Sequence, residues 1–220
     1  MSKGFWAVIA AIVLIFVGVA VFGGNDKTNT TSSSKNSGLS NNVQGKGTTG
    51  VTVVEYGDYE CPYCAAAAPV VKAGVAEFGD KIKFQFRNFP LVNLHRNAFA
   101  AARAAEAAAL QGKFWEMHDA LYDPSNNKAW TAASNPNPYF EQYAQQIGLN
   151  VNKYKTDFSS SQVNDTINAD MDEGNRLKIT GTPTFFINGK KVEIQPNLDS
   201  FRKAVNDAIA QQSASTKPSN

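Results

Sequence analysis

Two cysteines, Cys61 and Cys64, are the residues of this sequence whose type and spacing point most directly to chemistry. They enclose Pro62 and Tyr63 in a Cys-x-x-Cys motif placed where an expected strand ends and an expected helix begins. A cysteine at a helix N-terminus meets free backbone N–H groups and the positive end of the helix dipole, which both favour the thiolate. Pro62 suits the first helical position because its missing N–H has no intrahelical partner there. We therefore predict that Cys61 is a nucleophile and that Cys64, one turn further on and more buried, is the resolving thiol.

The same cysteines could instead form an inert disulfide or part of a metal site. A bridge between such close neighbours closes too short a loop to hold a fold together, and an inert bridge gains nothing from a helix N-terminus. His95 and His118 would complete a set of zinc ligands, but they are 23 residues apart, which is not the spacing of a zinc finger. We expect no metal, and we interpret each histidine as a packing or surface residue.

The elements around the motif predict an α/β unit. Residues 51–56 are rich in β-branched side chains and predict a buried strand. A helix at 62–78 follows and ends at Gly79, and residues 81–86 alternate polar and apolar side chains as a second strand does. Strand, helix and strand in this order predict a βαβ unit with a right-handed crossover.

The middle of the chain, about residues 93–178, has a helical pattern instead. The helix candidates there are 96–111, which is rich in alanine, 114–122, 139–147 and 161–177, separated by turns. Strand character returns at 184–187, where Asn188-Gly189 predicts a type I′ turn into a strand at 191–194. An amphipathic helix at 198–210 closes the fold. The whole pattern predicts an α/β fold with an inserted helical domain.

Composition indicates one globular domain with appendages. The 220 residues are 43% hydrophobic and 18% charged, a balance typical of folded chains. Lys and Arg number 21 against 19 Asp and Glu, which leaves a net charge of +2. Because phosphate-rich partners call for a basic excess, we expect no binding to nucleic acid. Residues 51–212 are enough to bury about 70% of the surface of their unfolded chain in one core.

The N-terminal residues predict attachment to a membrane. Residues 5–22 are uncharged and apolar, and at 1.5 Å per residue they reach about 27 Å, within the range of spanning helices. Lys3 predicts that residues 1–4 are cytoplasmic and that the catalytic domain is extracytoplasmic, as a single-pass signal-anchor protein of the cell membrane. A signal peptide cleaved after Val21-Phe22-Gly23 is the alternative.

The appendages on either side of the domain are polar. Residues 23–50 consist almost wholly of Gly, Ser, Thr, Asn and Lys, so they cannot bury a core and we expect a flexible linker. Residues 213–220 are expected to form a polar tail.

Taken together, the motifs resemble those of DsbA-like members of the thioredoxin superfamily. Residues 53–60 lead into the cysteine pair, Pro69 follows Cys64 by five residues, and residues 181–185, Gly-Thr-Pro-Thr-Phe, resemble the cis-proline loop of that family. The likeness covers residues 51 to about 210. It implies a thioredoxin-like fold in which Pro183 lies against the active-site thiol and Thr182 beside it.

The resemblance also gives a role to Glu55, a carboxylate inside an otherwise apolar strand. The family places a carboxylate under the active site six residues before the first cysteine, and Glu55 occupies this position. A buried acid without a cationic partner has a raised pKa and can relay protons. The alternative is an outward-facing residue or a residue at the end of the strand. We expect Asp58 and Glu60, next to the motif, to be exposed to solvent.

The resemblance implies a thiol:disulfide oxidoreductase that introduces disulfides into exported proteins through the Cys61–Cys64 pair. Its partners would be unfolded or reduced exported proteins and a quinone-linked membrane reoxidase of the DsbB or vitamin K epoxide reductase type. The redox-active disulfide would be its one active group, with no other cofactor, and the chain would be a monomer.

The direction of the reaction stays open at this point. The dipeptide Pro62-Tyr63 lacks the histidine that the best-known oxidase carries between its cysteines, so a reductase or isomerase of the same fold is the alternative. A membrane-tethered peptide-binding or chaperone module with an incidental disulfide is a third hypothesis.

Overall fold

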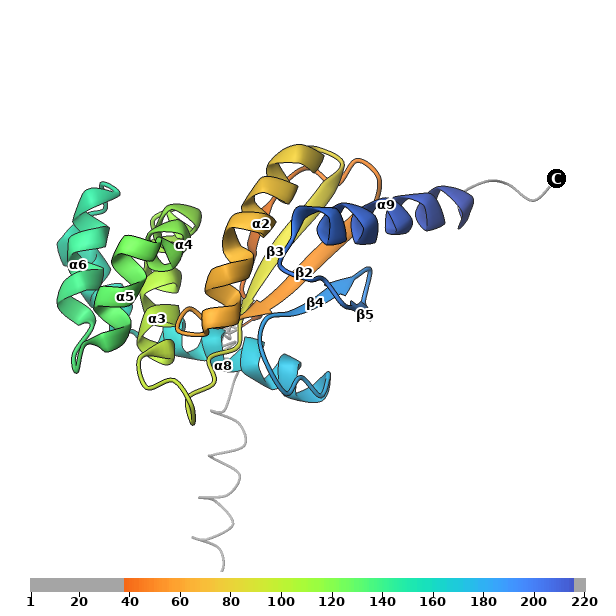
Figure 1. The fold of residues 1–220 in the computed structure, drawn as a ribbon. Coiled ribbons are helices and arrows are strands. Elements are labelled where there is room, and N and C mark those ends of the chain that lie inside the picture. Colours follow the sequence, from red (N-terminus) through yellow and green to blue (C-terminus); the bar gives the residue numbers. More distant parts are fainter. Residues whose placement is uncertain (1–37, 216–220) are drawn as a thin grey trace, which may run out of the picture. The chain divides into compact units, whose positions relative to one another are not determined.

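The computed structural model describes residues 38–215, whose centre is a five-stranded sheet in the order β1-β3-β2-β4-β5 (Figure 1). β2 and β3 are parallel, and the other neighbouring strands are antiparallel. The strands are β1 (Asn42–Gln44), β2 (Val51–Gly57), β3 (Ile82–Asn88), β4 (Thr184–Ile187) and β5 (Lys190–Val192). The expected strand–helix–strand unit is thus present as β2, α2 (Pro62–Phe78) and β3.

Helix α2 and the C-terminal helix α9 (Leu198–Ser215) cover one face of this sheet (Figure 1). Gly74 on α2 allows the two helices to approach closely, because a Cβ there would lie 2.4 Å from the Phe201 ring of α9. The buried side chains of this layer are Val51, Val53, Val71, Val75, Phe78, Ile82, Phe84, Phe185, Ile187, Phe201 and Val205. They alternate along each strand, as the period of a strand requires.

Between β3 and β4 the chain forms the inserted helical domain. Its helices are α3 (Ala98–Ala109), α4 (Phe114–Tyr122), α5 (Pro124–Ala132), α6 (Asn137–Gln146), α7 (Val151–Phe158) and α8 (Ser161–Arg176). Most alanines of α3 are buried, and their small side chains let the neighbouring helices pack closely. The core of this domain is continuous with Cys61, Cys64 and Phe86, so the helical insertion forms part of the surroundings of the cysteines.

Two of these helices, α5 and α7, lie where the sequence indicated turns. Pro124 occupies the first turn of α5, and the Asp123 side chain caps this helix by accepting a hydrogen bond from the Ser125 N–H. Asn150 caps α7 in the same way through the Lys153 N–H. Pro, Asp and Asn start helices as readily as they form turns, so short helices with few buried side chains escape a search for apolar periodicity.

The expectation of a flexible linker up to residue 50 is wrong for residues 38–50. β1 pairs with β3, and the following turn donates its Gly47 and Thr48 N–H groups to carbonyl groups of residues 80–82. Ser40 and Asn42 are buried and hydrogen-bonded, Ser40 N to Asp170 and the Asn42 side chain to Glu106. Backbone hydrogen bonds and buried polar side chains hold residues 38–50 in place. Neither interaction requires apolar residues, so the polar composition of this stretch did not predict its order.

The remaining differences concern the ends of elements. Asn188 and Gly189 both have positive φ, as the predicted turn requires, but β5 is shorter than the predicted strand at 191–194. α9 continues to Ser215, so residues 213–215 are helical and not part of a polar tail as predicted, and the remainder of the predicted tail lies outside the described residues. The predicted anchor at 5–22 lies outside the described residues. Within residues 38–215 no helix has the length and apolar character needed to cross a membrane.

Candidate active site

Cys61 occupies the N-cap of α2, with Pro62 in the first turn, as predicted. Both cysteines are free thiols and both are buried, with 3% of Cys61 and none of Cys64 exposed. Tyr63, between them, is 75% exposed. The motif therefore presents the Tyr63 ring to solvent, while Cys61 is almost completely covered and Cys64 completely so.

The two thiols have opposite acidities. The Cys64 thiol donates a hydrogen bond to the Cys61 sulfur, and this is the largest of the effects that lower the pKa of Cys61 to about 5. Burial opposes the shift, while the Thr182 hydroxyl and the backbone N–H groups of Cys64 and Tyr63 add to it. Burial, together with the same hydrogen bond, raises the pKa of Cys64 well above its ordinary value. Near neutral pH the site thus holds a thiolate at Cys61 and a thiol at Cys64.

The loop before β4 lies beside Cys61, as predicted. The Thr182-Pro183 peptide bond is cis, and the Cys61 thiol lies 3.3 Å from the Thr182 carbonyl oxygen. The Thr184 hydroxyl donates a 2.7 Å hydrogen bond to the Gly181 carbonyl and braces the loop. The Thr182 hydroxyl is buried and has no hydrogen-bond partner within residues 38–215, and it is one of the groups that lower the pKa of Cys61.

Glu55 lies on β2 between two aromatic neighbours, Phe86 on β3 and Phe185 on β4. It is 2% exposed, which excludes the alternative of an outward-facing residue. Burial raises its pKa to about 8, and the negative charge of Cys61 adds to this shift. The carboxyl is therefore protonated near neutral pH. Above its own pKa, its negative charge is one of the effects that raise the pKa of the Cys64 thiol.

Asp58 and its partners are the part of the site that the sequence reasoning missed. Expected to be exposed, Asp58 is 1% exposed and accepts hydrogen bonds from the Glu60 N–H at 2.8 Å, the Leu91 N–H at 2.8 Å and His95 Nδ1 at 2.7 Å. Glu60 is half-buried and accepts a 2.6 Å hydrogen bond from the Asn97 N–H. The available signal in the sequence was the position of Asp58 next to the aromatic residue Tyr59, which is buried in the structure. No sequence pattern indicated that Asp58 would contact residues 91–97.

The histidines differ in their environment. His118 packs among the rings of Tyr59, Phe86, Phe114, Trp115 and Tyr122, and burial lowers its pKa. Its interpretation as a packing residue is confirmed. His95 is half-buried at the active-site loop instead. Throughout residues 38–215 no three His, Cys, Asp or Glu side chains are grouped so that they could hold a metal.

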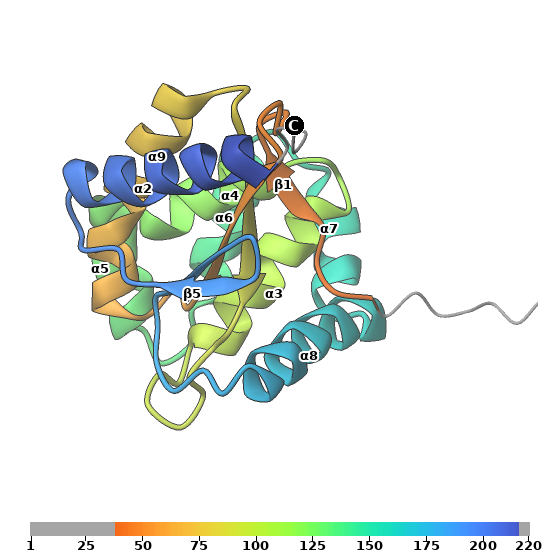
Figure 2. The ribbon, with the colours of Figure 1, turned by 90° about the vertical axis from the view of Figure 1, so that its right-hand side faces the viewer.

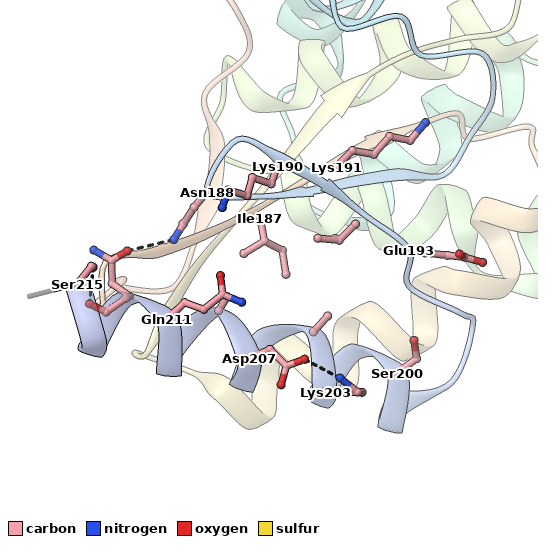
Figure 3. Close-up of a pocket in the computed structure, with 14 residues that line it drawn as sticks. Ile187, Asn188, Lys190, Lys191, Glu193, Ser200, Lys203, Asp207, Gln211 and Ser215 are labelled. Carbon is pink, nitrogen blue, oxygen red and sulfur yellow. Dashed lines mark hydrogen bonds and ion pairs between the residues drawn. The ribbon is translucent and has the colours of Figure 1, made fainter.

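A groove of about 810 Å³ lies away from this site, between the β4–β5 hairpin and α9 (Figure 3). Lys190, Lys191 and Lys203 line it, and Lys203 pairs with Asp207 at 2.6 Å. Figure 2 shows β5 at the edge of the sheet, below α9. Lysines on an edge strand discourage pairing with a strand of another chain. This role explains Lys190 and Lys191 on β5, so the groove does not need a ligand to account for them.

Comparisons with known proteins agree with this geometry. The family model described as Thioredoxin matches residues 39–207, a range that includes β1. The Na(+)/H(+) antiporter NhaA 1 of Mycolicibacterium gilvum is 36% identical over 151 residues, which are 68% of this chain and 23% of that protein. The chain thus spans less than a quarter of the length of this relative.

Solved structures show the same fold. A thioredoxin-like oxidoreductase from Silicibacter pomeroyi has a TM-score of 0.63 and 29% identity, covering 76% of this chain and 90% of that one. BdbD from Bacillus subtilis, in its oxidised form, has a TM-score of 0.65 and 24% identity, covering 76% and 92% of the two chains. At this lower identity the likeness shows the fold alone. The chain therefore belongs to the thioredoxin family, has a DsbA-type fold and carries a Cys-x-x-Cys pair of free thiols.

Proposed function

We propose that the protein is an extracytoplasmic dithiol oxidase that introduces disulfides into exported proteins through Cys61 and Cys64. The observation that carries this proposal is the division of the pair into an acidic thiol at Cys61 and a completely buried thiol at Cys64 that keeps its proton. A thiolate that is stable at neutral pH favours the reduced enzyme, so it makes the disulfide a stronger oxidant.

The exchange begins with the disulfide form. A substrate thiolate attacks the Cys61 sulfur, the S–S bond breaks, and Cys64 leaves with the bonding electron pair. A second substrate thiolate then attacks the substrate sulfur of the mixed disulfide, and Cys61 leaves as a thiolate. The substrate loses two electrons and the enzyme gains them. The low pKa of Cys61 makes it a good leaving group in this second step.

Glu55 acts as a proton relay in this proposal. The departing Cys64 sulfur requires a proton because its pKa lies well above its ordinary value. Glu55 holds a proton near neutral pH because its own pKa is about 8. The pair can therefore pass a proton between them within the buried region as the disulfide opens and closes.

Thr182 and Pro183 are proposed to bind the substrate next to the reacting sulfur. The Thr182 carbonyl lies 3.3 Å from the Cys61 thiol, so a substrate that reaches this sulfur also meets the loop. Pro62 and Tyr63 form the active-site dipeptide, and the exposed Tyr63 ring adds an apolar contact for an unfolded chain.

The tether and the partners belong to the same proposal. The apolar run at residues 5–22 would anchor the chain in the cell membrane. A quinone-linked membrane reoxidase of the DsbB or vitamin K epoxide reductase type would restore the disulfide, and the enzyme would act as a monomer.

The extracytoplasmic location is tested by adding protease to intact cells. Protease is expected to release a fragment that contains the described domain, whereas a domain protected from protease would contradict this location.

The activity is tested with the oxidised full chain in detergent and a reduced, unfolded protein that has two cysteines. We expect stoichiometric loss of substrate thiols with wild-type chain and none with Cys61→Ser. If the reduced chain instead opens a substrate disulfide faster than the oxidised chain forms one, the protein is a reductase and the proposal is wrong.

A further inference from the structure

His95 lies at the loop that carries Cys61 although it is remote from the cysteines in sequence, because both residues are hydrogen-bonded to Asp58. Asp58 holds it there, since the buried carboxylate lies 2.7 Å from His95 Nδ1. The side chain of Asp58 is completely buried, whereas that of His95 is 20% exposed. A buried carboxylate needs partners, so the Asp58–His95 contact fixes the ring rather than leaving it to solvent.

Asp58 also joins the two loops that carry these residues. Its carboxylate accepts hydrogen bonds from the Glu60 and Leu91 N–H groups, and its carbonyl accepts a 3.1 Å hydrogen bond from the Cys61 N–H. The same residue therefore positions the thiol and the imidazole. Motion of one relative to the other would break hydrogen bonds to a buried group.

The charged groups that face His95 are acidic. Asp58 on the loop after β2 contacts it, and the negative charges of Glu60 on the same loop and of Cys61 at the start of α2 also act on it. The neighbouring cation on its own loop, Arg96, is bonded elsewhere, to carbonyl groups at the end of α5. Burial by itself would lower the pKa of His95, but the hydrogen bond and charge of Asp58 and the charges of Cys61 and Glu60 raise it.

We propose that His95, held by Asp58, is a positioning residue whose positive charge stabilises the Cys61 thiolate in the reduced enzyme, and that disulfide formation weakens proton binding at His95. This inference rests on the proposed function, because it assigns the group that adjusts the reactivity of Cys61. The interaction is reciprocal: a thiolate that favours the imidazolium is favoured by it to the same extent.

The order in which Cys61 and His95 lose their protons sets the pH range in which the two opposite charges coexist. As pH rises, Cys61 loses its proton at about 5, before His95, whose pKa is raised above 6.5. Between these values a thiolate faces an imidazolium. Above the pKa of His95 the positive charge is lost, and with it the stabilisation of the thiolate. Oxidation removes the thiolate, so the pKa of His95 is then expected to fall.

The test is His95→Asn in the reduced full chain, with thiolate absorbance followed against pH. The Asn amide can still donate to Asp58 in place of Nδ1 but carries no charge. We expect the pKa of Cys61 to rise by about half a unit, the effect of one charge a few ångströms away in a water-like dielectric. The matched control Lys72→Gln removes an exposed positive charge that pairs with Asp119, and it should leave the titration unchanged. An unchanged titration in His95→Asn would overturn the proposal.

A second measurement needs no variant at position 95. The chain has two histidines, and the low pKa of buried His118 separates its nuclear magnetic resonance titration from that of His95. We expect the pKa of His95 to be higher in the reduced protein than in the disulfide form. Equal values in the two forms would also overturn the inference. If the pKa of Cys61 rises in His95→Asn and the pKa of His95 differs between the two redox forms, but the wild-type chain does not oxidise substrate thiols, the proposed function alone is refuted.

Discussion

The Cys61 thiol and the Thr182 carbonyl oxygen, 121 residues apart in the chain, lie 3.3 Å from each other. The sheet produces this contact, because β2 leads into the cysteine loop and β4 starts directly after the Thr182-Pro183 loop. The two strands are antiparallel neighbours in which Tyr56 faces Thr184. The Cys61 sulfur and the loop beside it are therefore positioned by the same strand pairing.

The difference in acidity between the thiols predicts selective alkylation. In the reduced full chain at pH 6.5, iodoacetamide is expected to modify Cys61 at least about tenfold faster than Cys64, because only the thiolate reacts. Peptide mapping by mass spectrometry measures both rates in one sample. Equal rates would contradict the assigned roles.

The Thr182 hydroxyl predicts a change in the thiolate titration. Thr182→Val keeps the shape of the side chain but removes a hydroxyl that lowers the pKa of Cys61. We therefore expect this pKa to rise, with a correspondingly smaller thiolate absorbance at pH 6. Thr131→Val is a suitable control, since the hydroxyl of Thr131 bonds within its own helix at 2.8 Å. A titration that is the same in both variants would exclude the Thr182 hydroxyl from the site.

Burial of Glu55 predicts that stability depends on pH. Its pKa is about 8 in the fold against an ordinary value of 4.5, so the fold favours the protonated form. The reduced wild type is expected to lose stability relative to Glu55→Gln as pH rises from about 4.5 to 8, by on the order of a few kcal/mol. Urea unfolding at several pH values gives this difference, and a difference that is constant over the range would show that Glu55 is ionised in the fold.

The buried carboxylate Asp170 predicts how firmly residues 38–50 are held. It accepts hydrogen bonds from the backbone N–H groups of Ser40 and Asn88, at 2.9 Å each. Asp170→Asn places an amide N–H₂ group against one of these two donors, so we expect the free energy of unfolding to fall by about 2–4 kcal/mol. Asp172→Asn, on the exposed side of the same helix, should change it by less than about 0.5 kcal/mol. Equal effects would mean that residues 38–50 are held by other contacts.

Local patterns predicted the elements that carry the chemistry. The β-branched run of β2, Pro62 at the start of α2 and the Asn188-Gly189 turn are short-range signals, and the helix at 62–78 and the strand at 184–187 have the expected bounds. The position of Thr182 beside Cys61 came from family resemblance, because no local pattern reports a contact between distant loops. These residues thus illustrate what sequence can supply before a structure is known.

Contacts made by buried polar groups could not be predicted in this way. Asp58, Asp170 and Ser40 look like ordinary loop or surface residues in the sequence, yet all three are buried. Their burial depends on partners supplied by distant segments, such as the Leu91 N–H for Asp58. Composition and periodicity describe apolar burial alone, so they place such residues at the surface.

The reduction potential of the Cys61–Cys64 pair tests the central claim most directly. The full chain would be equilibrated with defined ratios of reduced to oxidised glutathione, and the fraction of free thiol measured after acid quenching. A stable Cys61 thiolate predicts a potential nearer to the value of about −120 mV for DsbA than to about −270 mV for thioredoxin. A potential at or below the thioredoxin value would contradict an oxidase and identify a reductase.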